Sequence, residues 1–374
     1  MSLVYVRVRS EPELSPPAAT VGPIAWMRAN LFSSPANAVT TIVLAALALW
    51  LIPPLIAWAT VHAVWSAPDG ALCRAHQEGA CWAFIGHKIG YLLYGSYPEP
   101  LRWRVNLTEA LGAFLIVWLL WPRAPRRSLG AWLFFLVYPV VAYVLLVGAP
   151  ALGLARVDTL LWGGVFVTML TALVGIVVSL PLGVLLALGR RSQMPFVSAA
   201  SVVFIEVMRG VPFITVLYMA NNMLPLFLPP GVEPDRFLRP LVGIALFSAA
   251  YMAEEVRGGL QSLPRGQYEG AMALGLDYWR MTSLIALPQA LVLVIPGLVN
   301  NFIGLFKDTS LVSIVGVNDF LEALDHAMKD PAWSGPTIFS TGYAFAGLFY
   351  FVFCYAMSRY SAAMERRLGM GQRR

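Results

Sequence analysis

The most constraining feature of this chain is a set of six long runs without Asp, Glu, Lys or Arg. They cover residues 29–68, 128–155, 159–189, 210–232, 281–306 and 331–358. A bilayer core about 30 Å thick requires roughly 20 apolar residues of helix, and every run reaches that length. Only 12% of the 374 residues are charged, about half the share typical of soluble domains. The sequence therefore predicts an all-α polytopic membrane protein and excludes an ordinary soluble enzyme and a disordered chain.

Two shorter apolar segments bring the expected number of transmembrane helices to about eight. The expected limits are 38–64, 105–121, 129–150, 160–189, 196–228 with an interfacial start, 237–256, 283–306 and 337–358. Basic residues indicate the orientation, because they gather in cytoplasmic loops. If the N-terminus is cytoplasmic, most of the 26 lysines and arginines lie inside. Both termini are therefore expected in the cytoplasm, and the first run is expected to be an uncleaved helix.

The charge and the cysteines exclude two further classes of site. The net charge is +6, but the arginines lie at the ends of apolar runs, as topology signals do, so nucleic acid is not an expected partner. The spacing of cysteines and histidines predicts no metal site. Cys73 and Cys81 fall in the loop expected outside, where they would form either a structural disulfide or two free thiols on an interfacial helix. Cys354 is expected to pack within the last span.

The loop after residue 255 is the most informative segment for function. A turn at Pro264 and Gly266 precedes a short helix, in whose first turn we expect Glu269. Ala271, Leu274 and Leu276 give that helix an apolar side. Such a side either docks into the groove of a partner or lies along the membrane interface, and the residues alone favour neither.

Several motifs in order make the chain resemble a known family. Glu269-Gly270-Ala271, Gly275, Ile285 and Leu287-Pro288 match the EAA signature of ABC importer permeases at its full spacing. The segments that resemble the polar amino acid permeases of the histidine/glutamine type are Arg209-Gly-Val-Pro212, Arg257-Gly-Gly-Leu-Gln261 and Leu305-Phe-Lys-Asp-Thr-Ser-Leu311. The signature prefers Ala at Gly270, and Gly weakens a helix by about 1 kcal/mol, so the helix could begin one residue late.

The resemblance covers about residues 156–360 and implies four domains. They are a cytoplasmic tail (1–36), an extension with three spans and a periplasmic loop (37–155), a five-helix permease core (156–360) and a basic cytoplasmic tail (361–374). The extension is similar to that of the long permease subunit in general or acidic L-amino acid systems. The family implies a permease subunit of an ATP-driven amino acid importer in the bacterial inner membrane.

The resemblance also implies partners and a coupling site. The 264–280 loop would contact a cytoplasmic ATPase through Glu269, Gly270, Ala271, Gly275 and Leu276. No lysine follows a glycine, so the phosphate-binding Gly-Lys pair is missing. No cofactor is expected in this chain, and ATP and Mg would bind to the ATPase. The expected partners are two ABC ATPase copies, a periplasmic amino acid binding protein, the lipid bilayer and a second permease, preferably a non-identical one that makes a heterodimer.

Polar residues within the spans are candidates for the substrate path. Asn300, Asn301, Lys307 and Asp308 would meet a zwitterion, or they would lock two helices by an ion pair and amide hydrogen bonds. Further candidates are Tyr218, Asn221 and Tyr251, for each of which helix packing is favoured.

Glu206 and Arg209 lie three residues apart, so on a helix they face the same side. This spacing favours a structural ion pair, and gating is the second role open to it.

Two rival functions are an ion-coupled secondary amino acid carrier and an intramembrane enzyme. The exposed loop argues against the carrier, and no Gly-x-Ser-x-Gly or His-Glu-x-x-His motif supports an enzyme.

Overall fold

The structure is a computed structural model that describes residues 22–121, 123–229 and 231–368. In these ranges the only extended pairings are two isolated bridges, Gly95 with Trp162 and Gly164 with Asp319. The predicted all-α class is therefore confirmed. The described residues divide into two compact units: residues up to Val64 with His76–Ala80, and Trp65–Ala75 with everything from Cys81 onward.

The first unit consists mainly of one long apolar helix. Its first helix is α1 (Pro23–Asn30), and α2 (Pro35–Ile56) follows. Ser34 precedes α2, and its Oγ accepts a hydrogen bond of 3.2 Å from the backbone N–H of Asn37. This is an ordinary N-cap. A π-helical turn, η2 (Ala57–Val61), follows the prolines at 53 and 54. Together they give 27 residues, enough to cross a bilayer.

The second unit contains helices for the other seven predicted spans. The elements that correspond to them are η3 (Glu99–Leu101) with α5 (Arg102–Leu120); α6 (Arg127–Trp132), η4 (Leu133–Val137) and α7 (Tyr138–Val147); α8 (Val165–Arg190); α9 (Pro195–Gly210), α10 (Phe213–Met223) and η7 (Leu224–Phe227); α11 (Leu238–Ser262); α13 (Tyr278–Met281), η8 (Thr282–Ala286), α14 (Leu287–Asp308) and η9 (Thr309–Val315); and α16 (Pro336–Arg367).

Two of these segments differ from a simple span. The α9 and α10 helices meet at 111°, because Pro212 disfavours helical backbone at Val211, which is extended. The α11 helix has 25 residues but carries two glutamates and two arginines. Across the described residues, six helices are long and apolar enough to span a membrane, or seven with the bent pair. The count of eight expected from the sequence is reached only by including α11.

The centre of the second unit is the contact between α8 and α11. A Cβ added to Gly183 would lie 2.4 Å from Cβ of Met252, and one added to Gly175 would lie 2.9 Å from Ile244. Ala249 and Ala253 of α11 are fully buried. Small residues allow the two backbones to approach closely, as they do in membrane helix pairs.

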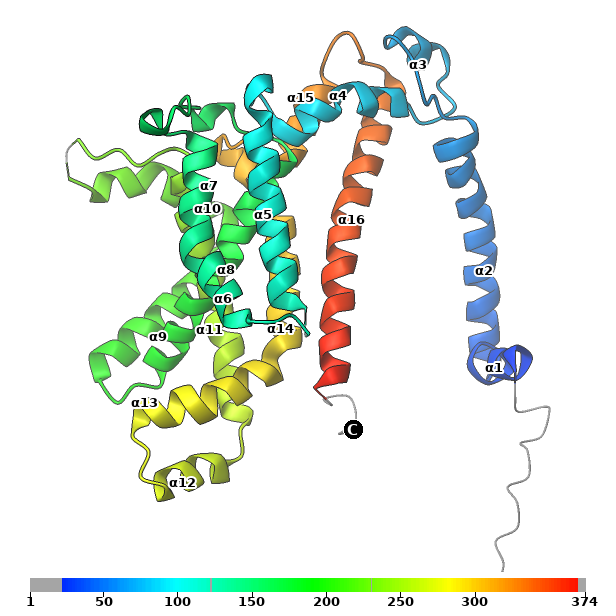
Figure 1. Cartoon of the computed structure of the whole chain (residues 1–374). Helices are drawn as coiled ribbons and strands as arrows, with labels where there is room; N and C mark the ends of the chain where they lie inside the picture. The colour runs from blue at the N-terminus through cyan, green and yellow to red at the C-terminus, as the bar shows by residue number, and fades with distance from the viewer. Residues whose placement is uncertain (1–21, 122, 230, 369–374) are drawn as a thin grey trace, which may run out of the picture. The chain divides into compact units, whose positions relative to one another are not determined.

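Short helices cover the end of the bundle away from α12 (Figure 1). They are α3 (Ala71–Ala75), α4 (Trp82–Tyr94), η5 (Pro150–Leu152), η6 (Thr159–Leu161) and α15 (Phe320–Met328). Cys73 and Cys81 form a disulfide with Cα atoms 5.8 Å apart. Lys88 of α4 forms an ion pair with Asp330, and the Phe84 and Trp333 rings are 6.1 Å apart. The α4 helix is thereby fastened to the segment that leads into α16.

Candidate functional site

One cavity of about 350 Å³ lies between α10, α11 and α14. Its lining residues are Phe213, Phe247, Ser248, Tyr251, Met252, Asn300, Asn301, Gly304, Leu305, Lys307 and Asp308. We call it the Lys307 cavity. It brings together five of the seven residues that the sequence indicates for a substrate path, four from α14 and Tyr251 from α11.

Four polar or charged residues of α14, Asn300, Asn301, Lys307 and Asp308, line this cavity. Residues 300, 304, 307 and 308 share one helical face by their spacing. Within the described part of the chain, no hydrogen bond or ion pair involves the side chains of Asn300, Asn301, Lys307 or Asp308. Lys307 is exposed and Asp308 is half-buried. The cavity therefore offers an ammonium, a carboxylate and two amides to whatever enters it.

Aromatic rings form the opposite wall of the Lys307 cavity. The centroids of Phe213 and Phe247 are 4.7 Å apart, and those of Phe247 and Tyr251 are 5.1 Å apart. The two phenylalanines lie within apolar runs, where no sequence signal distinguishes them from core residues. An aromatic face can also accept a cation. The arrangement thus offers charged, amide and aromatic groups to a small zwitterion.

Tyr218 and Asn221 lie apart from this cavity. Tyr218 on α10 is 60% exposed and does not line the Lys307 cavity. Asn221 lines a second cavity of about 310 Å³, to which Arg239 also contributes. We call it the Arg239 cavity. The candidates that the sequence indicates are therefore divided between two places.

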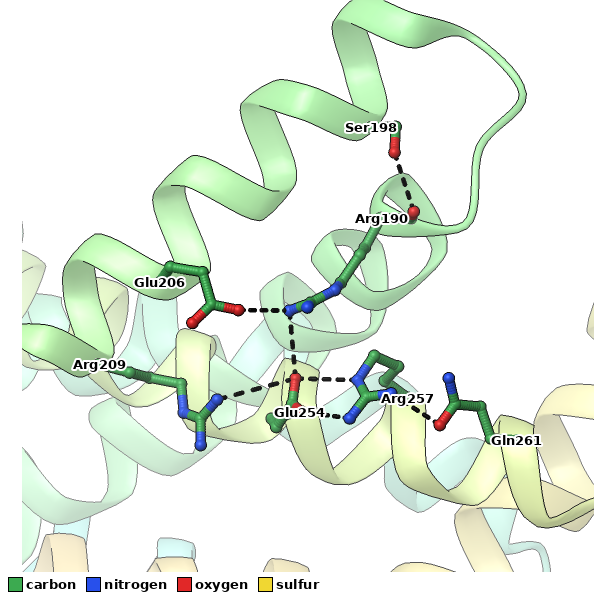
Figure 2. Close-up of polar contacts among 7 residues, drawn as sticks. All are labelled: Arg190, Ser198, Glu206, Arg209, Glu254, Arg257 and Gln261. Atoms are coloured by element: carbon green, nitrogen blue, oxygen red, sulfur yellow. Dashed lines mark hydrogen bonds and ion pairs between the residues drawn. The ribbon is translucent and has the colours of Figure 1, made fainter.

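An ion network joins α8, α9 and α11 around Glu254 (Figure 2). Its carboxylate lies 3.4 Å from Nη1 of Arg190 and 3.9 Å from Nη1 of Arg209, and it accepts a hydrogen bond of 3.0 Å from Nε of Arg257. Glu206 pairs with Arg190 at 3.0 Å. The described residues thus show no direct Glu206–Arg209 pair, contrary to expectation, because each finds its partner on another helix.

The coupling loop predicted at 264–280 forms α12 (Arg265–Ala273) and the start of α13. Gly275 has φ +72°, a conformation that glycine adopts readily. Its N–H donates to Met272 O at 2.9 Å, and that of Leu276 donates to Ala271 O at 3.2 Å, the bonds of a Schellman cap. The helix starts at Arg265 and runs through Gly270, so the glycine does not delay it and Glu269 lies beyond the first turn.

One side of α12 is fastened to the bundle. The Tyr268 hydroxyl donates to Leu260 O at 2.9 Å and accepts from Nη1 of Arg191 at 3.3 Å. Ala271, which the sequence predicts at the ATPase contact, is only 2% exposed and therefore offers no surface to a partner. No sequence signal marks Tyr268 for this role, because a tyrosine in an exposed loop looks the same whether or not it anchors a helix.

Another part of the α12 segment is largely exposed in the described chain. Leu274 is 79% exposed and Met272 is 58% exposed, and Glu269 beside them forms no ion pair in the described residues. An apolar pair next to a carboxylate, held on a rigid capped helix, is suited to docking.

A family model and two relatives of this chain are each described as components of membrane transport systems. The family model described as "Binding-protein-dependent transport system inner membrane component" matches residues 179–370. The inner membrane amino-acid ABC transporter permease protein YhdY of Escherichia coli (strain K12) is 49% identical over 349 residues, 93% of each chain. The glutamate/glutamine/aspartate/asparagine transport system permease protein BztC of Rhodobacter capsulatus is 38% identical, over 97% of this chain and 98% of its own. A solved amino acid ABC transporter with histidines is 27% identical, with TM-score 0.48, over 55% of this chain and 92% of its own.

Proposed function

This chain belongs to the family of binding-protein-dependent transport system inner membrane components, and on that premise we propose that it carries amino acids through an ATP-driven importer. The predicted membership among ABC transporter permeases is confirmed, and the chain is a multi-pass protein of the inner membrane. The two relatives above are named for amino-acid transport, which supports amino acids as its substrates.

The observation that carries the proposal is the Lys307 cavity. An amino acid presents one carboxylate and one ammonium, and the cavity offers Lys307 and Asp308 beside Asn300 and Asn301. Because their side chains are not paired with other described residues, they need not break existing bonds to bind a substrate. Placing unpaired polar groups within the spans costs free energy, and a bound substrate would offset that cost.

We infer that α12 transmits the ATPase movement. Its exposed Leu274 and Met272 would seat in a groove of the cytoplasmic ATPase, with Glu269, Gly270 and Gly275 at the contact. The tethers through Tyr268 and Ala271 support this role, because a rigid link passes a displacement on to α8 and α11. ATP and Mg would bind to the ATPase and not to this chain.

We propose the remaining assembly on the same basis. It comprises a second, preferably non-identical permease, two ATPase copies and a periplasmic binding protein, with both termini of this chain in the cytoplasm. The match to residues 179–370 supports a permease core at 156–360, behind an extension at 37–155. Orientation is testable by cysteine labelling from each side of the membrane at Gly270→Cys and Gly153→Cys in a cysteine-free chain.

Uptake of labelled L-glutamate, L-aspartate, L-glutamine and L-asparagine into cells that lack related systems tests the substrate class. Uptake should continue when a protonophore dissipates the proton gradient across the membrane while the ATP concentration is maintained. Uptake that collapses with the gradient would instead support the ion-coupled carrier.

Asp308→Asn should raise KM by about tenfold or more, since a charged hydrogen bond contributes about 1.5–3 kcal/mol. Ser310→Ala, whose hydroxyl binds the Lys307 carbonyl on the same segment, is the matched control.

Glu269→Lys tests the coupling helix. We expect import to fall at least tenfold while expression, Tm and binding-protein docking stay unchanged, because the side chain is exposed and makes no described bond. Glu365→Lys, which makes the same change of charge near the end of α16, is the control. Normal import by Glu269→Lys would show that this residue does not contact the motor.

A further inference from the structure

The Arg239 cavity shares no lining residue with the Lys307 cavity. Its lining residues are Thr159, Leu160, Trp162, Val167, Asn221, Asn222, Arg236, Phe237, Arg239, Val315, Gly316, Val317 and Asn318. Its volume, about 310 Å³, is at the lower end of the roughly 300–1,000 Å³ typical of small-molecule sites. A single short segment, η9, connects Asp308 of the first cavity with Val315 of the second.

Two buried polar atoms of this lining have no hydrogen-bond partner in the described chain. They are the indole Nε1 of Trp162 and the side-chain oxygen of Asn318. Trp162 is only 6% exposed, so water reaches its N–H poorly. An unsatisfied buried donor or acceptor is costly, and the residues that line this cavity supply one of each. A ligand that both accepts and donates hydrogen bonds would satisfy both.

The charge of the cavity is positive. Arg239 donates through Nε to Pro234 O at 3.0 Å and through Nη1 to Asn221 O at 3.4 Å. In the described ranges neither Arg236 nor Arg239 has a carboxylate within ion-pair distance. The neighbouring Asp235 does not line the cavity, but its carboxylate accepts from two lining residues, from Thr159 Oγ1 and from the backbone N–H of Phe237, each at 2.8 Å.

We propose that the Arg239 cavity is a second, separate binding site for the amino acid, at the other end of η9 from the Lys307 cavity. The carboxylate of the ligand would bind Arg239 and the Trp162 N–H, and its ammonium would donate to Asn318. This inference rests on the proposed function and adds a second binding site to the substrate path.

The combination of groups decides between anions. A lipid phosphodiester would satisfy the arginines and the indole, but it has no hydrogen to donate to the Asn318 oxygen. Inorganic phosphate would give that oxygen only a P–OH group and no cationic donor. An α-amino acid carries the carboxylate and the ammonium on one carbon, so it fits both. The location also fits, because η9 leads from this cavity to the polar face of α14.

The experiment uses the purified complete transporter in proteoliposomes with its binding protein and labelled L-glutamate, L-aspartate, L-glutamine or L-asparagine as separate probes. Trp162→Phe removes the indole donor and keeps an aromatic ring, and Arg239→Gln removes the charge. Trp103→Phe and Arg156→Gln are matched controls, because both residues are exposed and lie outside the cavity. Tm of each variant checks folding, and binding-protein affinity is measured separately.

We expect Arg239→Gln to raise KM about tenfold or more and Trp162→Phe to raise it severalfold, with kcat, Tm and binding-protein affinity close to those of the controls. If both variants match the controls in KM, the site is not used and the inference is wrong. If KM rises only in proportion to a loss of binding-protein affinity, the cavity is a docking surface and the inference is also wrong. If the native complex imports none of the four probes, the proposed function itself is wrong. This outcome is seen in the native complex alone, so it can be told apart from a failure of the second site, which is seen only in the variants.

Discussion

The guanidinium of Arg209 lies 5.7 Å from the centre of the Tyr251 ring. Tyr251 lines the Lys307 cavity, and Arg209 also lies 3.9 Å from Glu254 in the ion network of Figure 2. One arginine therefore contacts both the aromatic wall of the cavity and the charges that join α8, α9 and α11. A substitution in the aromatic wall or in the ion network can therefore affect the other through Arg209.

Glu254→Gln should destabilise the second unit. Glu254 is close to three arginines and its side chain is 23% exposed, so the neutral amide leaves three cations without their shared carboxylate. We expect a loss of about 1–2 kcal/mol, because the pairs are partly screened by solvent. Thermal unfolding in detergent measures it. Glu99→Gln, whose side chain is 82% exposed in a single pair with Arg102, should change Tm little; equal effects of both changes would contradict the importance of the network.

Gly183→Ala and Gly347→Ala should act in opposite directions. The added methyl at 183 would lie 2.4 Å from Met252 Cβ and 2.9 Å from the backbone N of Ala253, which forces α8 and α11 apart at a cost of about 1–3 kcal/mol. At 347 nothing lies within 4 Å, so alanine should stabilise α16 by up to about 1 kcal/mol through helix propensity. Tm of the two variants gives the signs, and a stable Gly183→Ala protein would show that the helix contact is loose.

Asp319 should make stability depend on pH. This residue lies outside the spans and caps α15, accepting from the backbone N–H groups of Leu321 and Glu322 at 3.2 and 3.1 Å. Burial nevertheless raises the pKa of its carboxyl to about 7. Because the folded state then holds the proton more tightly than the unfolded state, its contribution to stability is gained as pH falls from about 7 to 4 and is lost as pH rises through 7.

The Asp319→Asn variant separates this effect from other titrations. Its Tm should vary less than that of the native chain between pH 5 and 8, because the amide does not ionise. Asp158→Asn changes an exposed cap that binds the N–H of Leu160 and should leave the pH dependence as it is. An Asp319→Asn curve parallel to the native one would assign the pH dependence to other groups.

Loss of the Cys73–Cys81 disulfide should loosen the segment around α3. The bond joins residues eight positions apart, and closing so short a loop is worth about 2–3 kcal/mol in the chain-entropy account. Cys73→Ser with Cys81→Ser should therefore speed proteolysis between 65 and 81, measured by limited digestion and mass spectrometry. Cys354→Ser, which alters the free thiol, is the control and should leave the digestion pattern unchanged.

The positions of the spans could be predicted because hydropathy is a property of local sequence. Every expected segment is a helix, and the polar positions of α14 fall on one face as the helical period requires. The bend after Gly210 is also local, since Pro212 restricts Val211. The helical period cannot reveal which residue of another helix pairs with a given charge. The pairing of Glu206 with Arg190, 16 positions away in the sequence, could therefore not be predicted.

The Arg239 cavity shows the same limit more clearly. Trp162, Arg239 and Asn318 lie in three segments that meet only through the fold, and each alone resembles an ordinary interfacial aromatic, topology arginine or loop amide. The unsatisfied atoms of Trp162 and Asn318 are a property of three-dimensional packing. No spacing in the sequence encodes them.

The contacts of α3 and α4 with the start of α16 have a consequence for shortening this chain. Arg74 donates to the carbonyls of Ala332 and Ser334 at 3.3 and 3.4 Å, and the backbone N–H of Cys81 donates to Thr341 Oγ1 at 2.9 Å. Phe84 and Trp333 are both buried, with their rings against each other. A truncated protein of residues 156–374 would expose this aromatic face to water and would be prone to aggregate. A fragment of this permease that stays monodisperse during purification therefore has to retain α3 and α4.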